Sequence, residues 1–162
     1  MRNVIVDTSP IQYLYQISLL DLLPRLYSRA IIPQSVVEEL AVGNSLGIRL
    51  PNVANLNWAD IREAQAKNIL PMVTELGAGE REAIALALEL KESLLVLDDA
   101  LARQYAKLLE LPFTGTLGVL LKAKQSGYIE NIAPILKQLE AHKFRLDAAT
   151  RTAVLKLAGE QL

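Results

Sequence analysis

Asn3-Val4-Ile5-Val6-Asp7-Thr8-Ser9 is the stretch of sequence that decides the fold of this chain. Its three consecutive apolar residues are typical of a strand covered on both faces, as in a parallel sheet between two layers of helices. Asp7 follows this strand directly, and in such sheets ligands bind beyond the carboxyl ends of the strands. We therefore expect Asp7 to lie at the edge of the sheet where a site can form.

The same pattern occurs a second time, in Leu94-Leu95-Val96-Leu97-Asp98-Asp99. Parallel strands have their carboxyl ends at the same edge of a sheet, so two such strands would bring acids from distant parts of the chain together. Our central hypothesis is that Asp7 and the Asp98-Asp99 pair belong to one site.

Strands and helices alternate along the rest of the chain. Short strands are expected over residues 30–32 and 58–61, a strand or turn over 112–116, and a surface loop over 43–57. Helical periodicity predicts helices over residues 10–16, 19–27 with an interruption at Pro24, 33–42, a short segment before Pro71, a helix that Glu80 opens, 99–109, 116–124, 132–141 and 148–157. This alternation predicts a single domain over residues 1–162, an α/β fold with three layers (α/β/α) and a mainly parallel central sheet.

The composition is that of a globular protein with one domain. The chain has 162 residues, of which 51% are hydrophobic and 22% charged. No apolar run approaches the roughly 20 residues of a membrane span, and the N-terminus does not resemble a signal peptide. The absence of cysteine excludes disulfides and thiolate metal sites. We expect a cytoplasmic protein that does not bind membranes.

The net charge of −1 hides an asymmetry along the chain. Residues 1–100 contain 8 Lys or Arg against 13 Asp or Glu, whereas residues 101–162 contain 9 against 5. An acidic half and a basic half would suit a polyanionic substrate held beside a metal site, although solvated helix faces also explain such a distribution.

The candidate site residues are acids that lie at strand ends and on two helices: Asp7, Glu39 or its neighbour Glu38, Glu80, and Asp99 with Asp98. Glu80 precedes an apolar stripe at helical spacing and should point along a buried face, whereas Glu82 and Glu89 should be solvated. Several ionised carboxylates in close proximity repel one another unless a cation lies among them. Oxygen ligands alone favour Mg²⁺ or Mn²⁺, and with Mg²⁺ the expected chemistry is phosphoryl transfer.

Each of these acids also has a purely structural explanation. Asp7 and Asp99 could cap the helices that follow them, and Glu80 could interact with its helix dipole. Glu38 and Glu39 could be solvated, and Asp99 could pair with Arg103 four residues later. The residue pattern by itself leaves both interpretations open.

Five blocks of the sequence resemble the PIN-domain nucleases, and more narrowly a prokaryotic PIN-like branch, in an order and spacing that span almost the whole chain. The resemblance implies a compact α/β/α ribonuclease that uses three or four acids to hold Mg²⁺ or Mn²⁺. Many members of the family are toxins of toxin–antitoxin pairs. The blocks are residues 4–10 (Val4 to Pro10), 32–40, 77–87, 97–103 and 114–120.

The family pattern implies a role for each acid. Asp7 matches the first acid, Glu39 the acid before a Leu, Glu80 the acid heading an Ala-rich helix, and Asp99 the acid after the later strand, with Asp98 as the alternative. The implied catalytic residues are thus Asp7, Glu39, Glu80 and Asp99, and the implied metal ligands are Asp7, Glu80, Asp99 and Asp98. Thr8 and Ser9 match a small polar residue that hydrogen-bonds a carboxylate or a metal water, and Thr114 is either such a supporting residue or a turn residue.

The implied reaction is metal-assisted hydrolysis of RNA phosphodiester bonds by a water that the ion activates. Four basic residues of the C-terminal half are candidates for gripping the nucleic-acid backbone: Arg103, Lys107, Lys122 and Lys124. The only histidine, His142, is far from the acids in sequence and is expected at the surface or in packing. The resemblance also implies a small antitoxin protein as a partner, and a homodimer.

Two other phosphoryl-transfer folds are excluded by the order of their motifs. In receiver domains the acidic pair follows the first strand, whereas here too little chain follows Asp99 to complete that fold. Phosphatases of the haloacid dehalogenase type need a second Asp two residues after the nucleophile, and position 9 is Ser. The remaining alternative is a catalytically weak or inactive PIN-like module that binds nucleic acid or regulates.

Overall fold

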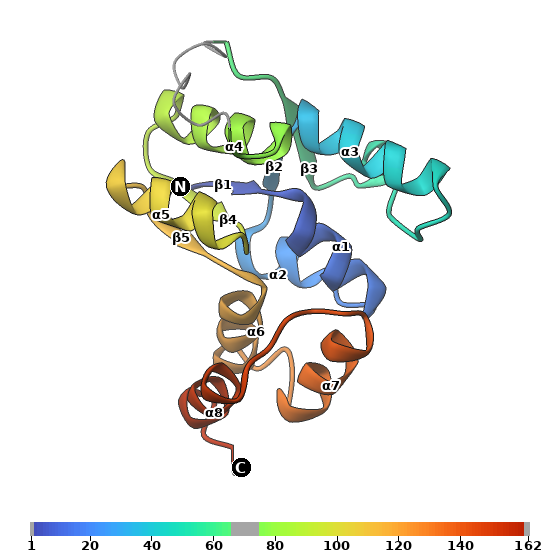
Figure 1. Cartoon of the computed structure of the whole chain (residues 1–162), viewed down its shortest axis with the longest axis vertical. Coiled ribbons are helices and arrows are strands. Elements are labelled where there is room, and N and C mark those ends of the chain that lie inside the picture. The colour runs from blue at the N-terminus through green and yellow to red at the C-terminus, as the bar shows by residue number, and fades with distance from the viewer. Residues whose placement is uncertain (1, 66–74, 161–162) are drawn as a thin grey trace.

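A five-stranded parallel sheet forms the centre of the protein in a computed structural model that describes residues 2–65 and 75–160 (Figure 1). The strand order is β3-β2-β1-β4-β5, and every pair of neighbours is parallel. The strands are β1 (Asn3–Val6), β2 (Ala30–Pro33), β3 (Ala59–Arg62), β4 (Ser93–Val96) and β5 (Phe113–Thr114). The strand order reverses between β1 and β4, which is where open α/β sheets bind their ligands.

Helices follow the strands and cover both faces of the sheet, so the predicted three-layer α/β/α architecture is confirmed (Figure 1). The described helices are α1 (Thr8–Gln16), α2 (Leu22–Tyr27), α3 (Gln34–Ser45), α4 (Ala78–Glu89), α5 (Ala100–Leu108), α6 (Thr116–Gln125), α7 (Ala133–Ala141) and α8 (Ala148–Leu157), with a short 3₁₀ helix, η1 (Val53–Asn55). None of the described helices is long and apolar enough to span a bilayer.

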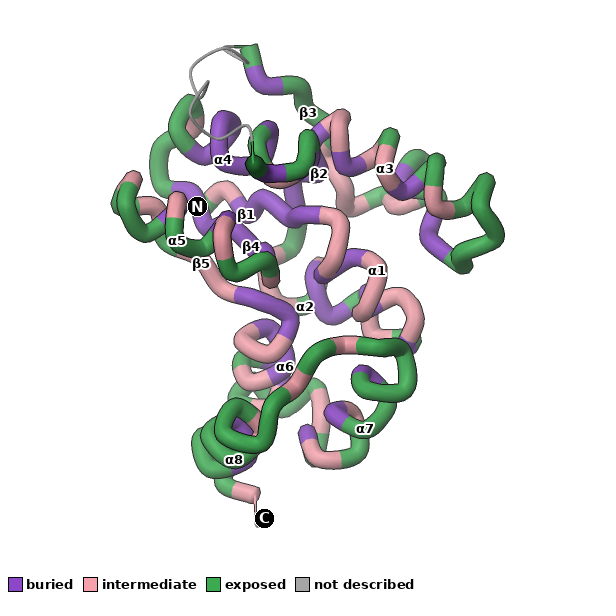
Figure 2. Tube along the Cα trace, viewed as in Figure 1, coloured by how far each residue is buried: buried purple, intermediate pink, exposed green. Residues whose placement is uncertain are grey.

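Alternation along β1 divides the core into two parts. Val4 and Val6 pack into a cluster with residues of α1, α2, α3, α6, α7 and α8, whereas Ile5 packs on the other face with residues of α4 and α5. After its first residue, which is half-buried, this central strand is buried (Figure 2). Burial on both faces explains why the strand is a continuous apolar run instead of an alternating one.

The expected elements agree with the structure except in detail. The loop predicted over 43–57 contains the last turn of α3 and the 3₁₀ helix η1, and the weak strand over 58–61 is the edge strand β3. The helix predicted over 19–27 begins only at Leu22, and the interruption expected at Pro24 was wrong. Pro24 lies in the first turn, where backbone N–H groups have no helical partner to lose. The short helix expected before Pro71 falls mainly on residues 66–74, outside the described residues.

Candidate active site

Asp7 lies directly after β1 and is the most deeply buried acid of the candidate site. Only 4% of its surface is exposed, and its backbone N–H donates to the Val96 carbonyl of β4 at 2.9 Å. It occupies the N-cap position of α1, yet its side chain makes no capping hydrogen bond. Its Oδ1 atom is buried without a hydrogen-bond partner. Helix capping therefore does not account for this carboxylate.

Glu39, on α3, approaches Asp7 from the neighbouring helix. The Thr8 hydroxyl donates to Glu39 Oε1 at 2.6 Å, which fixes one of its oxygens. Close approach at Gly79 shows how near the two acids lie, because a Cβ on this residue would overlap Glu39 Oε1 and lie 3.2 Å from Asp7 Oδ1. Glu38 is exposed and accepts a hydrogen bond from Gln34. Of the two neighbours, Glu39 is the one that faces Asp7.

Glu80, in the first turn of α4, completes the approach from a third helix. A Cβ at Gly77 would lie 3.4 Å from Glu80 Oε1 and 3.7 Å from Glu39 Oε2. Glu80 Oε2 is buried and has no hydrogen-bond partner, and the carboxylate of Asp99 lies within hydrogen-bonding range of the Glu80 carboxyl group. Two carboxylates can hydrogen-bond each other only when one of them carries a proton. A proton or a bound cation is therefore needed to neutralise the negative charge of Glu80 and Asp99.

The two acids of the Asp98-Asp99 pair, which follows β4, have different hydrogen-bond partners. Both oxygens of Asp98 accept hydrogen bonds from Thr116, one from the backbone N–H at 2.8 Å and one from the hydroxyl at 2.7 Å. Asp99 caps α5 by accepting from the Ala102 N–H at 2.9 Å, so the capping explanation holds for this residue. Because the carboxylate of Asp99 also lies beside Glu80, capping does not remove it from the cluster.

Electrostatics shows that these acids form one cluster. Burial, and to a smaller degree the charges of Glu39, Asp98 and Asp99, raise the pKa of Asp7 to about 7, although the Thr8 backbone N–H offsets part of the rise. Burial and the same kind of repulsion, first from Asp7 and then from Asp99, raise the pKa of Glu80 to about 7 as well. Acids placed like this near neutral pH hold protons unless a cation replaces them.

The donor set fits a hard divalent ion, but the described side chains do not yet surround one. Buried carboxylate oxygens without partners at Asp7 and Glu80 are the ligands that Mg²⁺ and Mn²⁺ prefer. Among the residues that the structure describes, no group of three acids or histidines is arranged to hold an ion. Ligation by this cluster would therefore require side-chain rotation.

A family model described as a PIN domain matches residues 3–160 of the chain. The chain belongs to the PIN-domain family. This assignment confirms the resemblance of the sequence blocks and places the protein in a nuclease-type family. No curated protein matches the chain.

The basic residues expected to grip nucleic acid are dispersed over this PIN domain. Arg103 is close enough to Asp98 for its charge to favour the ionised carboxylate, and its guanidinium lies 5.0 Å from the centre of the Phe113 ring. Lys107 is exposed in the last turn of α5. Lys122 lies 4.5 Å from the ring centre of Tyr27. These three side chains do not form one patch at the acids.

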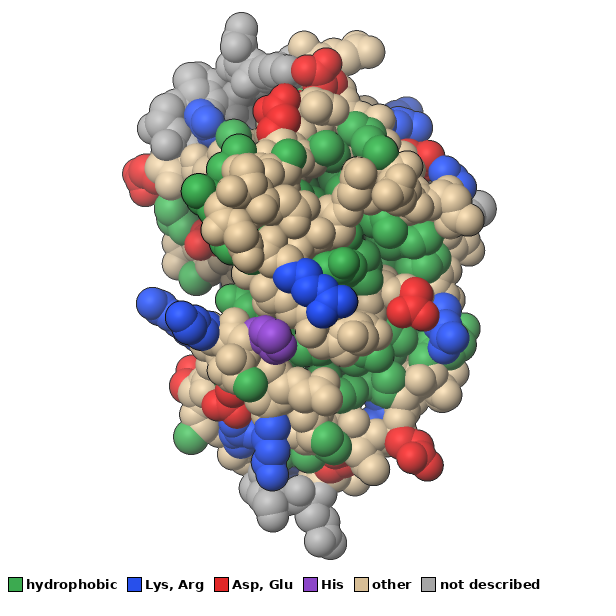
Figure 3. All heavy atoms as spheres, turned by 90° about the vertical axis from the view of Figure 1, so that its right-hand side faces the viewer, with side chains coloured by type: hydrophobic (Ala, Val, Ile, Leu, Met, Phe, Trp, Pro, Cys, Tyr) green, Lys and Arg blue, Asp and Glu red, His purple; other side chains and the backbone are tan. Residues whose placement is uncertain are grey.

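Lys124 is held elsewhere, by an ion pair of 2.9 Å with Glu160 near the C-terminus. The same carboxylate accepts the backbone N–H groups of Ile132 and Ala133 at the start of α7. Lys124 therefore has a structural partner, and its expected role toward nucleic acid stays a prediction. The single histidine, His142, lies exposed at the surface, purple in Figure 3, where basic, acidic and hydrophobic side chains are interspersed.

The supporting residues differ from those expected. Thr8 supports Glu39 as described, and Ser9 and Thr114 are half-buried, with the Thr114 hydroxyl against Gly118. Thr116, fully buried, is the residue of the Thr114-Gly115-Thr116 block that hydrogen-bonds an acid. Thr116 and Asp98 each lie two residues after register partners of the neighbouring strands β5 and β4, so the strand pairing brings them together, and the sequence alone does not mark Thr116.

The prediction that Glu82 is solvated was wrong. Only 6% of Glu82 is exposed, and its two oxygens accept the backbone N–H groups of Ser35 at 2.7 Å and Ala64 at 3.0 Å. Ser35 lies in the first turn of α3, where N–H groups lack helical partners and the helix dipole favours a negative charge. Glu82 thus ties α4 to the start of α3, and these two helices carry Glu80 and Glu39.

Proposed function

We propose that this PIN domain is a divalent-metal-dependent ribonuclease that hydrolyses phosphodiester bonds in RNA. The observation that carries the proposal is the pair of buried, unpartnered carboxylate oxygens of Asp7 and Glu80 within a cluster of acids at the strand-order reversal. Leaving such oxygens unsatisfied costs free energy, and a bound cation would recover it.

Asp7, Glu80 and Asp99 would hold Mg²⁺ or Mn²⁺, with Glu39 or Asp98 beside them. The bound ion would stabilise the charge that develops on the phosphoryl oxygens and lower the pKa of water. Thr8 keeps Glu39 turned toward Asp7, and Thr116 donates two hydrogen bonds to Asp98 that offset part of the rise that burial causes in the pKa of Asp98. Because Asp7 and Glu80 bind protons up to about pH 7, ion binding would release them.

The test is cleavage of single-stranded RNA with Mn²⁺ by the wild type and by Asp7→Asn. We expect the substitution to abolish cleavage and to leave the circular dichroism spectrum unchanged. The matched control is Asp21→Asn, because Asp21 is an exposed aspartate with an exposed partner, Arg25. Cleavage that survives in Asp7→Asn, or that disappears equally in the control, would contradict the proposed role of Asp7.

A toxin role within a toxin–antitoxin pair is a narrower form of the same proposal. It predicts growth arrest when the wild type is expressed, and relief of that arrest by a small protein encoded next to it. Expression of Asp7→Asn provides the control, because it retains the fold without the first acid. Normal growth on expression of the wild type would count against the toxin role.

The second candidate is a PIN-like module that binds nucleic acid or regulates without cutting. It is favoured by the observation that no three described acids already surround one ion position. If the purified protein binds RNA but neither binds Mn²⁺ nor cleaves RNA under any condition tested, this second function replaces the first.

A further inference from the structure

A pocket of about 170 Å³ opens at the amino-terminal ends of β1 and β2, away from the acid cluster at their carboxyl ends. Three of its lining residues are arginines: Arg2 just before β1, Arg29 just before β2, and Arg62, whose backbone lies at the carboxyl end of β3 in register with Pro33. Among the described residues that line it, Asp60 is the only acid. The pocket therefore carries an excess of positive charge.

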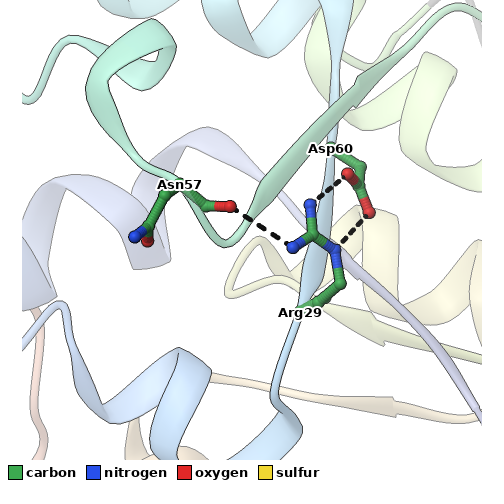
Figure 4. Close-up of polar contacts among 3 residues, drawn as sticks. All are labelled: Arg29, Asn57 and Asp60. Atoms are coloured by element: carbon green, nitrogen blue, oxygen red, sulfur yellow. Dashed lines mark hydrogen bonds and ion pairs between the residues drawn. The ribbon is translucent and has the colours of Figure 1, made fainter.

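Arg29 and Asp60 satisfy each other (Figure 4). Two guanidinium nitrogens of Arg29 donate to the two oxygens of Asp60 at 3.0 and 2.5 Å, and the third donates to the Asn57 carbonyl at 3.3 Å. This arrangement engages all three guanidinium nitrogens of Arg29 and both oxygens of the acid. The charge of Asp60 is thus committed to Arg29.

Arg2 and Arg62 are the two arginines of the pocket that do not pair with Asp60. Both are exposed, and neither forms an ion pair with a described carboxylate, although Arg62 lies near enough to Asp60 to favour its ionised form. Burial raises the pKa of the Tyr27 hydroxyl, and the charge of nearby Arg2 offsets part of that rise. The ammonium of Lys122 lies over the ring of the same tyrosine, at 4.5 Å from its centre. Arg2 and Lys122 thus lie close to one aromatic side chain, and Arg62 lines the same pocket as that tyrosine.

We propose that Arg2, Arg62 and Lys122, together with Tyr27, form a second binding surface for the phosphate backbone of single-stranded RNA, outside the acid cluster. Fixed cations beside an aromatic ring are the combination that single-strand binding surfaces use. We call this set of four residues the amino-edge surface. The inference deepens the proposed ribonuclease function by giving the substrate a second point of attachment.

The position of the amino-edge surface favours a long RNA over a small anion or an acidic protein. Arg2 and Asp7 flank β1, so they lie roughly 16 Å apart along an extended strand. Helix α6 links the two places, since it begins at Thr116 beside Asp98 and carries Lys122 about 9 Å further along its axis. An oligonucleotide of several residues can follow this helix from one place to the other, whereas a dinucleotide cannot occupy both.

Binding of a fluorescent 20-nucleotide RNA to the full chain in EDTA tests the proposal separately from cleavage. Loss of two phosphate contacts should lower the slope of log K against log salt by about 1.4, and affinity at 0.1 M salt about 25-fold. We expect this effect from Arg2→Gln combined with Arg62→Gln. The control, Lys143→Gln combined with Lys156→Gln, removes two exposed charges from other parts of the surface and should change the slope little.

Asp60→Asn should increase RNA affinity, a result that a misfolded variant would not give. It removes the one acid among the described residues that line the pocket, so we expect RNA affinity to rise several-fold. The proposal is overturned if the double arginine variant keeps the wild-type salt slope, or if it loses no more affinity than the control. It is also overturned if inorganic phosphate or polyglutamate of equal charge binds as tightly as the RNA and with the same dependence on Arg2 and Arg62.

Failure of the amino-edge surface and failure of the ribonuclease function give different results. If the wild type binds RNA through Arg2 and Arg62 but does not cut it, the surface stands and the nuclease proposal falls. If the wild type cuts RNA and the double arginine variant cuts it with the same KM, the nuclease proposal stands and the surface falls.

Discussion

Replacing Asp7 with asparagine should stabilise the metal-free protein at pH 8. The fold raises the pKa of Asp7 from an ordinary value of 3.8 to about 7, chiefly through burial. The folded state therefore binds a proton that the unfolded state has released, and the free energy of unfolding falls as pH rises from about 4 to about 7. A shift of this size corresponds to about 4 kcal/mol above pH 7. Asparagine has nearly the same shape, carries no charge and removes no capping hydrogen bond.

The assay is thermal and urea unfolding of both proteins in EDTA at pH 8 and at pH 4. The upper estimate of about 4 kcal/mol would raise the melting temperature by roughly 10 °C for a chain of this size. At pH 4 the difference should shrink toward zero, because Asp7 is then protonated in the folded state. Asp147→Asn is the control of opposite sign, since the Thr150 backbone N–H lowers the pKa of Asp147. A variant that is less stable than wild type at pH 8, or a gain independent of pH, would refute this reasoning.

Three further substitutions test the supports of the cluster. Glu82→Gln should destabilise the fold by about 1–3 kcal/mol in urea unfolding, because one of the two backbone N–H groups that Glu82 accepts from, at Ser35 and Ala64, loses its acceptor. A variant as stable as the exposed control Glu130→Gln would contradict this. Gly79→Ala should weaken Mn²⁺ binding at least tenfold in calorimetry, because the new Cβ displaces Glu39. The same substitution should improve helix propensity by about 1 kcal/mol. Unchanged Mn²⁺ affinity would mean that Glu39 moves freely. Thr116→Val should raise the pKa of Asp98, read by NMR, because it removes a donor to the ionised carboxylate; an unchanged pKa would show that the backbone N–H suffices.

The strands and the convergence of the main acids could be predicted from the sequence. An apolar run followed by an acid occurs at Asp7 and again at Asp98, and a parallel sheet brings such ends to one edge. Glu80 could be placed because it precedes an apolar stripe on α4. These inferences depend on local patterns and on one rule of topology, and both are visible in a single chain.

The partners of individual side chains could not be predicted. Glu38 and Glu39 differ by about 100° around the helix axis, and which of them faces Asp7 depends on how α3 packs. Glu82 accepts hydrogen bonds from backbone groups 47 and 18 residues away, which no residue type in the sequence marks. Lys124 meets Glu160 across 36 residues in the same way. Such contacts follow from tertiary packing and not from local pattern.

The cluster places function and stability in opposition. Asp7 and Glu80 are buried where their charges are costly, and the fold leaves one oxygen of each unsatisfied. Substitutions that remove these charges should stabilise the metal-free protein and abolish metal binding together. Proteins often give up stability at functional sites in this way.

Anomalous diffraction from a crystal soaked in Mn²⁺ tests the central claim most directly. We predict a manganese peak within ligating distance of a carboxylate oxygen of Asp7 and of at least one of Glu80 and Asp99, and no such peak in a crystal of Asp7→Asn. A soaked wild-type crystal without manganese at these acids, or with manganese bound only elsewhere, would contradict the metal site.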